Sequence, residues 1–476
     1  MSFRRLFRCT SCCSSSKRDE QIAIWVSVGT VFMTLFMTTV LAPSSKGDEA
    51  DAATSAIESQ PATEEAEASL SPARLEEHLE SFDTVWNTIN DRHWDPAHLE
   101  SVGWEGARDE LRPRVEQATT DDEAIQAMVD LVERVGLSHY QIIPEQAYDD
   151  DLRAAGSGVT GIELRMLDGA PTVFRLADDS PAQRAGVQTG WVVEAVGGES
   201  LDPVLERLRL REETTGERPG VIASIALEGR LRGPVGETLN VRFRDGDDAT
   251  REIDIPLEES PDPEFEAANL PPSPVSIRFR TIEDRIGYFS FSAFLDPGRL
   301  MSEFQRAVEA SRELDGLVID LRGNMGGIIA LCNGIGGWLL TDTPSAELGH
   351  LSTRQTDLKL VMNRRANPLN RPVAVLIDER SISSAEILSG GLKDTGVARV
   401  FGSVSAGMSL PSVIEKLPNG TAFQYAFANY TSASGRELEK NGVEPHVTVP
   451  LTRQDLLAGE DPALEAAIDW ISKQAG

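Results

Sequence analysis

The chain has 476 residues, and 40% of them are hydrophobic, so it is long enough for about three domains with apolar cores. Its formal net charge of −31 at pH 7 repels phosphate backbones, which argues against nucleic acid as a partner. Cys332 is the single cysteine outside the N-terminal tail, so no internal disulfide can stabilise the body of the chain.

An apolar segment follows a short basic tail at the N-terminus. Residues 22–41 read IAIWVSVGTVFMTLFMTTVL and carry no charge, which is long enough for a membrane-spanning helix. Five basic residues precede it, so the positive-inside rule keeps residues 1–21 in the cytoplasm. We expect a single-pass anchor over 22–42 in the cell inner membrane, with the later domains extracytoplasmic, and therefore in the periplasm if the cell is Gram-negative. A cleaved signal peptide is the alternative.

Two regions of different character come after this segment. Residues 43–71 are rich in Ala, Ser, Glu and Asp, and such a composition predicts an acidic disordered linker. From residue 72 to 150 apolar side chains recur at spacings of three and four, beginning with Leu75, Leu79 and Phe82. This spacing predicts a helical N-terminal domain.

Short strand-like runs punctuated by glycine fill residues 157–258. The stretches GVTGIELRM and SPAQRAGV resemble parts of a PDZ domain. The resemblance implies that Gly161, Ile162, Glu163 and Leu164 lie in a peptide-binding loop. In such a site loop amides hold a terminal carboxylate while an extended peptide pairs with a sheet edge. A module that only packs against the rest of the chain is the alternative.

A proline-rich stretch over 261–274 predicts a linker, and strands then alternate with helices over 275–476. RIGYFSFSAF, GLVIDL and PVAVLID are the expected strands. Alternation of this kind indicates an α/β layer architecture.

The second of these strands leads into a glycine-rich turn. Asp320 ends the strand, and Gly323, Gly326 and Gly327 open the next helix. Glycines allow close approach of the backbone to a ligand, and amides at a helix N-terminus attract negative charge. The pattern fits an oxyanion hole, although such loops are also common in α/β folds.

The third strand leads into a run of serines. Residues 373–377 are followed by Ser381, Ser383 and Ser384 at the start of a helix. A serine there gains from the positive end of the helix once it becomes an anion. Serine is also a common N-cap, and the pattern alone does not choose among the three.

Together, DLRGNMGG and the later SISSAE resemble the hallmark loops of the tail-specific (C-terminal processing) serine protease family. The similarity extends from about residue 72 to the C-terminus. It implies a multidomain α/β fold with a helical N-terminal region, a PDZ-like β domain and a crotonase/Clp protease-like α/β catalytic core. It also implies that Ser383 is the nucleophile and that the amides of Gly326 and Ser384 form the oxyanion hole.

One position departs from the bacterial members, which use a Ser-Lys pair. Met408 occupies the position of that lysine, and a thioether cannot act as a base. The stretch VGLSHYQIIP instead resembles the Ser-His element of the tricorn protease core, a subgroup with a Ser-His-Glu triad. This resemblance implies His139 as base, Ser138 as its accompanying hydroxyl and Glu439 as the carboxylate. His446 is a weaker rival base.

The chemistry of these residue types is coherent, because a serine hydroxyl needs a base and an imidazole near neutral pH can serve as one. We therefore predict a membrane-anchored extracytoplasmic serine endopeptidase that acts on polypeptides, with PDZ-assisted substrate binding. The alternative is a catalytically inactive relative that binds a ligand or a peptide. No Walker loop, Rossmann fingerprint, EF-hand or HExxH motif occurs, so we predict neither a cofactor nor a metal, and the oligomeric state stays open.

Overall fold

The computed structural model describes residues 69–149, 156–215, 220–267 and 269–475. The predicted cytoplasmic tail, the predicted anchor and nearly all of the predicted acidic linker lie outside these residues. Within the described ranges, no helix has both the length and the apolar character that a bilayer span requires.

Four helices open the described chain: α1 (Pro72–Arg92), α2 (Pro96–Ser101), α3 (Trp104–Glu116) and α4 (Asp121–Glu133). Local signals begin two of them. The Ser71 hydroxyl accepts the N–H of Arg74 at α1, and the Thr120 hydroxyl accepts the N–H of Glu123 at α4. The apolar faces of these helices share one buried cluster, which includes Phe82, and the helical periodicity therefore predicted this region correctly.

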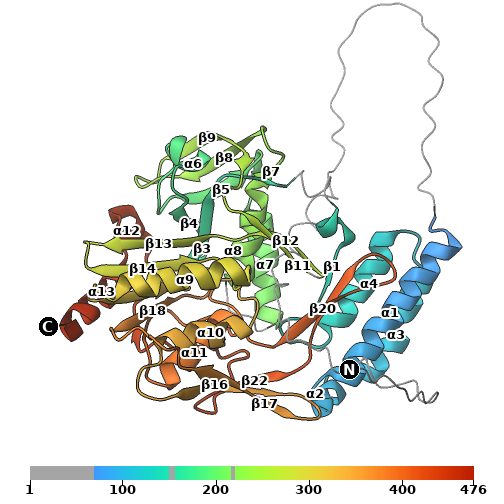
Figure 1. Ribbon diagram of the computed structural model, residues 1–476. Coiled ribbons are helices and arrows are strands. Elements are labelled where there is room, and N and C mark those ends of the chain that lie inside the picture. Colours follow the sequence, from blue (N-terminus) through green and yellow to red (C-terminus); the bar gives the residue numbers. More distant parts are fainter. Residues whose placement is uncertain (1–68, 150–155, 216–219, 268, 476) are drawn as a thin grey trace, which may run out of the picture.

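A short strand after these helices joins them to the far end of the chain. The elements here are β1 (Gln141–Ile143), η1 (Glu145–Tyr148), β20 (Ser412–Lys416) and β21 (Ala422–Ala426). β1 pairs antiparallel with β21, which in turn pairs with β20. The blue helices consequently lie against the orange strand β20 in Figure 1, and their cores are continuous. This pairing brings residues near 140 to residues beyond 400.

Residues 156–259, called the middle unit below, form a β-rich body (green in Figure 1). Its main sheet has the order β3 (Ile162–Leu167), β4 (Ala170–Leu176), β5 (Val192–Val196), β8 (Thr238–Arg244) and β9 (Thr250–Pro256), with β6 (Glu199–Ser200) also on β5. A smaller sheet has the order β10 (Glu258–Glu259), β2 (Gly158–Val159) and β7 (Arg232–Gly233). The helices are α6 (Pro181–Arg184), α7 (Asp202–Thr215) and α8 (Val221–Arg230). Strand β3 lies at an edge, and α8 packs beside it.

The proline-rich stretch before the core is more ordered than the linker predicted from its composition. β11 (Glu264–Ala267) and β12 (Leu270–Pro274) form a two-stranded antiparallel pair. Proline is tolerated there because a two-stranded ribbon leaves one side of each strand unpaired.

The C-terminal half is built on one six-stranded sheet. Its order is β13 (Ile277–Ile282), β14 (Ile286–Phe291), β15 (Gly316–Asp320), β18 (Val373–Ile377), β19 (Arg399–Gly402) and β23 (Val447–Thr448). All neighbours run parallel except the antiparallel first pair. The buried residues of the central strands alternate between two apolar clusters, because successive side chains point to opposite faces.

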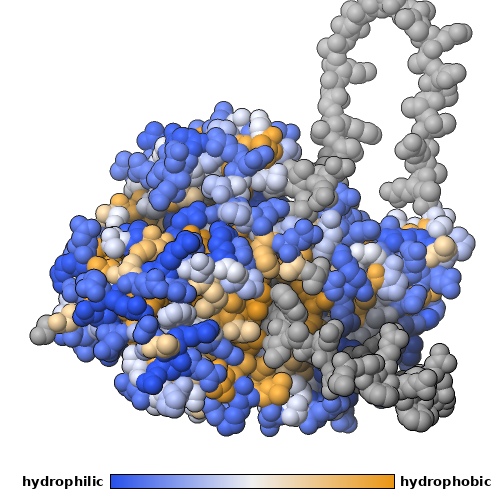
Figure 2. All heavy atoms as spheres, in the orientation of Figure 1, coloured by the Kyte–Doolittle hydropathy of each residue, from blue (hydrophilic) through white to orange (hydrophobic). Residues whose placement is uncertain are grey.

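Helices cover both faces of this sheet, as the α/β pattern requires. One face packs against α9 (Pro297–Ser311), α10 (Ala330–Leu339) and α11 (Ser384–Asp394), and the other packs against α13 (Pro462–Ala475). A three-stranded sheet of β17 (Asp357–Asn363), β16 (Ser345–Ser352) and β22 (Asn429–Ser432) lies beyond α10 and α11. Helix α12 (Arg453–Ala458) precedes α13. In Figure 2 hydrophilic residues cover most of the visible face, and hydrophobic residues gather over the lower part of the core.

Candidate active site

The predicted nucleophile Ser383 stands immediately before the first residue of α11 and is 2% exposed. Its φ of 57° lies in the left-handed region, which a residue with a Cβ adopts only at a cost of about 1–3 kcal/mol. The connection from β18 to α11 covers residues 378–383, and Ser383 is its last residue. The hydroxyl therefore lies at the positive end of α11, where an alkoxide would be stabilised.

The glycine-rich turn after β15 lies directly against Ser383. A Cβ on Gly326 would lie 2.6 Å from the Ser383 Cβ and 3.1 Å from the Ser384 nitrogen, and the φ of Gly326 is +81°. The structure thus brings the two predicted loops into contact. They meet because β15 and β18 are parallel neighbours, whose carboxyl ends share one edge of the sheet.

The backbone amides at this contact differ in their bonding. Ser384 is the first residue of α11, so its N–H has no acceptor within the helix. The Gly326 N–H instead donates to Oδ1 of Asn324 at 2.9 Å. The predicted oxyanion amide of Gly326 is therefore engaged with a side chain in this structure.

The predicted base His139 is 4% exposed and has a φ of 63°. Its Nδ1 lies 2.7 Å from the Ser138 Oγ. The Ser138 hydroxyl donates to Oε2 of Glu439 at 2.9 Å, and the Ser138 N–H donates to Oε1 of Glu439 at 2.9 Å. The Glu439 carboxylate thus reaches the imidazole through Ser138.

This arrangement has a consequence for the tautomer of the imidazole. Because the Ser138 hydroxyl donates its hydrogen bond to Glu439, its oxygen accepts the hydrogen bond from the Nδ1–H of His139. The Nε2 atom of His139 then carries a lone pair and is able to act as a base.

The peptide segment of Met408 and Ser409 links the serine loop, residues 378–383, to the carboxylate of Glu439. The Ser383 N–H donates to the Met408 carbonyl at 2.9 Å, and the next N–H, that of Ser409, donates to Oε2 of Glu439 at 3.1 Å. The structure therefore connects Ser383, Ser138, His139 and Glu439 through hydrogen bonds and this one segment. The weaker candidate base His446 does not join this network. Its Nδ1 accepts the N–H of Val400 in the six-stranded sheet.

Burial shifts the ionisation of both titratable groups. It lowers the pKa of His139 to about 4 and raises the pKa of Glu439 to about 7. The N–H groups of Ser138 and Ser409 and the Ser138 hydroxyl oppose the shift of Glu439, because they stabilise the carboxylate. Burial thus favours the neutral form of each group, and a neutral imidazole is the form that accepts a proton.

Neither Lys393 nor Lys416 takes the place of the lysine missing at Met408. The Met408 side chain lies in an apolar cluster with Ile382 and with Ile225 of α8. Lys393 donates to the Glu444 carbonyl, and Lys416 lies over the ring of Tyr148. Both lysines are therefore committed to contacts elsewhere.

The sequence patterns did not reveal the role of Glu386, the last residue of SISSAE. This side chain is fully buried and accepts four hydrogen bonds, from the Ser405 hydroxyl and from the N–H groups of Ser383, Gly407 and Met408. It clamps the start of α11 to the segment that carries Met408. A capping box was the signal available in the sequence, because a glutamate follows the serine by three positions.

The residues of the predicted peptide-binding loop lie at the start of β3. Gly161 has a φ of +78°, and a Cβ there would lie 2.3 Å from the Ser180 Cβ. Glu163 lies 3.6 Å from Arg175, and the Leu164 N–H donates to Glu228 of α8 at 2.6 Å. The loop is therefore held by contacts within the middle unit, and Leu164 extends along the sheet edge.

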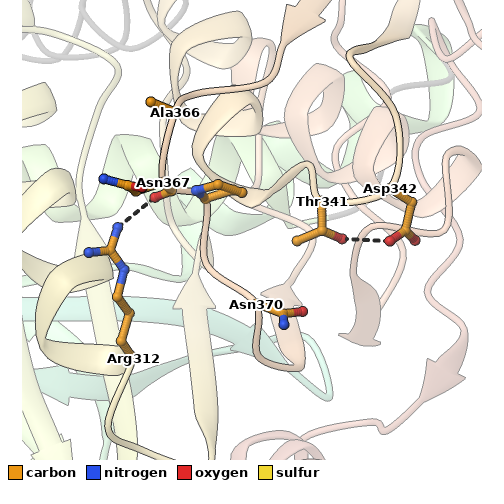
Figure 3. A pocket seen from close by; sticks show the side chains of 7 residues that line it. Arg312, Thr341, Asp342, Ala366, Asn367 and Asn370 are labelled. Atoms are coloured by element: carbon orange, nitrogen blue, oxygen red, sulfur yellow. Dashed lines mark hydrogen bonds between the residues drawn. The ribbon is translucent and has the colours of Figure 1, made fainter.

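A large surface hollow of about 680 Å³ lies away from these residues (Figure 3). It is lined by Arg312, Thr341, Asp342, Ala366, Asn367, Pro368 and Asn370. Figure 3 shows Arg312 bonded to the carbonyl of Asn367, and Thr341 bonded to Asp342. The lining has no serine, cysteine, histidine or lysine, so its chemistry does not resemble a serine-type hydrolytic site.

Two parts of the chain match models of known protein families. The model of peptidase family S41 matches residues 285–449, and that of the tricorn protease C1 domain matches residues 75–132. The chain is 26% identical to tricorn protease homolog 1 of Streptomyces coelicolor over 82% of this chain and 35% of that protein. It is 24% identical to the carboxy-terminal processing protease CtpB of Bacillus subtilis, over 63% of this chain and 57% of that protein.

The fold agrees with these matches. The solved photosystem II D1 C-terminal processing protease superposes with a TM-score of 0.53 at 18% identity, over 82% of this chain and 96% of that one. The predicted resemblance to the tail-specific serine proteases is confirmed, since the matching model of peptidase family S41 covers both predicted loops. The predicted multidomain α/β fold class is confirmed as well. The chain spans about a third of the length of the Streptomyces relative, 35%.

Proposed function

We propose that this chain is an endopeptidase in which Ser383 is the nucleophile and His139 the general base. The observation that supports this best is the position of Ser138, whose hydroxyl lies 2.7 Å from His139 and 2.9 Å from Glu439. A half-buried hydroxyl held in this way fixes the tautomer and the orientation of the imidazole. Ser138 and Glu439 are therefore positioning residues in this proposal.

The reaction follows from the roles of these groups. The Ser383 oxygen bonds to the carbonyl carbon of a peptide as its proton passes to Nε2 of His139. The bond between carbon and nitrogen then breaks, and His139 returns the proton to the departing amine. Water, activated by the same imidazole, hydrolyses the resulting ester and restores Ser383.

The oxyanion that forms in each addition to the carbonyl carbon needs hydrogen-bond donors. The Ser384 N–H has no acceptor within α11, and the Gly326 backbone touches Ser383. We assign the oxyanion to these two amides, and Gly326 then exchanges its bond with Asn324 for one with substrate. One such donor contributes about 3–4 kcal/mol to the transition state.

The N-terminal segment and the middle unit add two further parts to the proposal. Residues 22–42 anchor the chain in the inner membrane with its later domains outside the cytoplasm, since they form an uncharged run after basic residues. The middle unit presents substrate, because β3 is an edge strand able to accept an extended peptide. Polypeptides with an accessible C-terminal segment are the substrates we propose.

The test uses the full chain, purified in detergent, with a reduced and alkylated protein as substrate. We expect cleavage that Ser383→Ala and His139→Ala each abolish, while His350→Ala, at a half-exposed histidine of β16, leaves it intact. A fluorophosphonate should label the wild-type chain and not Ser383→Ala. Absence of both cleavage and labelling would support the alternative of an inactive relative that binds peptide or another ligand.

A further inference from the structure

His93 lies at the end of α1 and is fully buried. The centroid of its ring lies 4.2 Å from that of Trp94, 5.5 Å from that of His98 in α2 and 6.0 Å from that of Tyr140, with all four rings stacked. Tyr140 directly follows the proposed base His139. The His93 ring therefore packs the turn between α1 and α2 against the segment that carries His139.

The C-terminal half of the chain is joined to the same place. Nε of Arg354, in the turn between β16 and β17, donates to the His93 carbonyl at 3.0 Å, and its Nη2 donates to the Asn90 carbonyl at 2.8 Å. The Tyr140 hydroxyl donates to the Ala426 carbonyl of β21 at 3.0 Å. His93 thus lies at a junction between the N-terminal helices and strands of the C-terminal half.

The hydrogen bonds of His93 fix its charge state. Its Nδ1 accepts the backbone N–H of Asp95 at 3.0 Å, so this nitrogen carries no proton. The proton of the neutral ring is then on Nε2, which is buried without a hydrogen-bond partner among the described residues. A second proton would have to enter at Nδ1, where it would break the bond with Asp95. Protonation would also leave a positive charge in a buried site, which is unfavourable.

The charged groups around His93 do not offset this cost. Burial lowers the pKa of His93 to about 4, and the charges of His98 and Arg354 act in the same direction. Asp95 opposes them, but its Oδ1 already accepts two N–H groups at the start of α2. The Tyr140 hydroxyl stays neutral, because burial raises its pKa. A protonated His93 is therefore more stable in water than in this packing.

We propose that His93 is an acid-sensitive latch, whose protonation releases the turn between α1 and α2 from Tyr140 and thereby separates His139 from Ser383. The inference rests on the proposed function for its effect on cleavage, while the opening itself does not depend on that function. An exposed histidine has a pKa of about 6.5, so the opened form binds more protons than the closed form between about pH 6.5 and pH 4. The closed form is consequently retained above this interval and loses stability as the pH falls through it.

Hydrogen exchange of the β1 amides in the full chain, purified in detergent, measures the opening. Each exchange rate is divided by the intrinsic rate at the same pH, which gives a protection factor. Between pH 7.5 and pH 5 we expect the protection of β1 in the wild-type chain to fall about 30-fold, as the two pKa values of His93 require. This measurement needs no cleavage and detects opening of a small fraction of the molecules.

Two variants at His93 remove the titration in different ways. His93→Phe keeps the aromatic stack, and His93→Gln keeps an acceptor for the Asp95 N–H, so one serves where the other fails to fold. Each should show nearly the same protection of β1 at pH 7.5 and pH 5. His350→Gln is the matched control, at a half-exposed histidine of β16, and should respond like the wild-type chain. A fall in the His93 variants equal to that of the wild-type chain, or constant protection in the wild-type chain, overturns the latch.

Cleavage of an unfolded protein tests the link to the active site. Each chain is assayed at the urea concentration that halves its activity at pH 7.5, so that a shift of the opening equilibrium becomes visible. At pH 5 we expect the wild-type chain to lose about tenfold more activity than His93→Phe, and to regain it at pH 7.5. Titration of Glu439 affects both chains alike and cancels in this ratio. Equal losses overturn the link between His93 and His139. A wild-type chain that never cleaves refutes the peptidase proposal, while hydrogen exchange still decides the latch.

Discussion

Ser138 and Glu439 are joined by two hydrogen bonds of 2.9 Å, although 301 residues separate them in the sequence. The backbone N–H of Ser138 meets one carboxylate oxygen, and its hydroxyl meets the other. The pairing of β1 with β21 lies beside them and fixes the position of the N-terminal segment. The candidate site thus depends on a contact between the two ends of the described chain.

Replacement of Ser138 by alanine should lower kcat by about 10²–10⁴-fold with little change in KM, because His139 loses the group that orients it. Ser138→Thr keeps a hydroxyl and should recover part of the loss. Steady-state kinetics on a quenched peptide make the comparison. A KM effect without a kcat effect would instead indicate a role in substrate binding.

The pH profile should report the ionisation of Glu439. The pKa of His139 is lowered by burial to about 4, so the imidazole is neutral near pH 7 and can accept a proton. The pKa of Glu439 is raised by burial to about 7, so its carboxylate charge grows as the pH rises through that value. That charge stabilises the imidazolium formed in the transition state, so we expect kcat/KM to rise between about pH 6 and pH 8.

The matched variant for this profile is Glu439→Gln, which cannot ionise. Its kcat/KM should be low and nearly independent of pH over the same interval. A Glu439→Gln profile that keeps the rise would assign the titration to another group.

Gly326→Ala should impair both catalysis and stability. Its Cβ would lie 2.6 Å from the Ser383 Cβ, at a φ of +81°. We expect a loss of at least about 10²-fold in kcat, as for removal of an oxyanion donor, and destabilisation by about 1–3 kcal/mol. Gly435→Ala is the control, since Gly435 has a φ of +83° with no atom within 4 Å of an added Cβ.

The two glycine variants separate strain from contact. Both introduce a Cβ at a left-handed position, so denaturant unfolding should show a common loss of stability in the two. Only Gly326→Ala should lose activity. Similar kinetics for the two variants would mean that the glycine-rich loop does not control the reacting serine.

Glu386→Ala should displace Ser383 without removing any group proposed to react. Four donors would lose their acceptor in a buried space, which predicts destabilisation by about 2–4 kcal/mol and a fall in kcat. Glu386→Gln keeps one oxygen and should be intermediate. Urea unfolding and fluorophosphonate labelling rates measure the two effects, and unchanged labelling would exclude a positioning role.

The two loops that carry Ser383 and Gly326 were predictable from the sequence, because each follows a buried strand and contains its own turn chemistry. Helical periodicity likewise predicted the N-terminal helices, and alternation predicted the α/β core. These signals are local, since hydrophobic spacing and glycine placement act within a few residues. The family resemblance indicated which of the three serines to predict as the nucleophile.

Tertiary structure decided the contacts between distant segments. The bridge of Ser138 between His139 and Glu439 depends on strand pairing across most of the chain, and no local pattern encodes that pairing. The stack of His93 on Tyr140 likewise needs the end of α1 to meet the segment before β1. Burial sets the pKa of Glu439 and the pKa of His93. It arises only when these distant segments pack against one another.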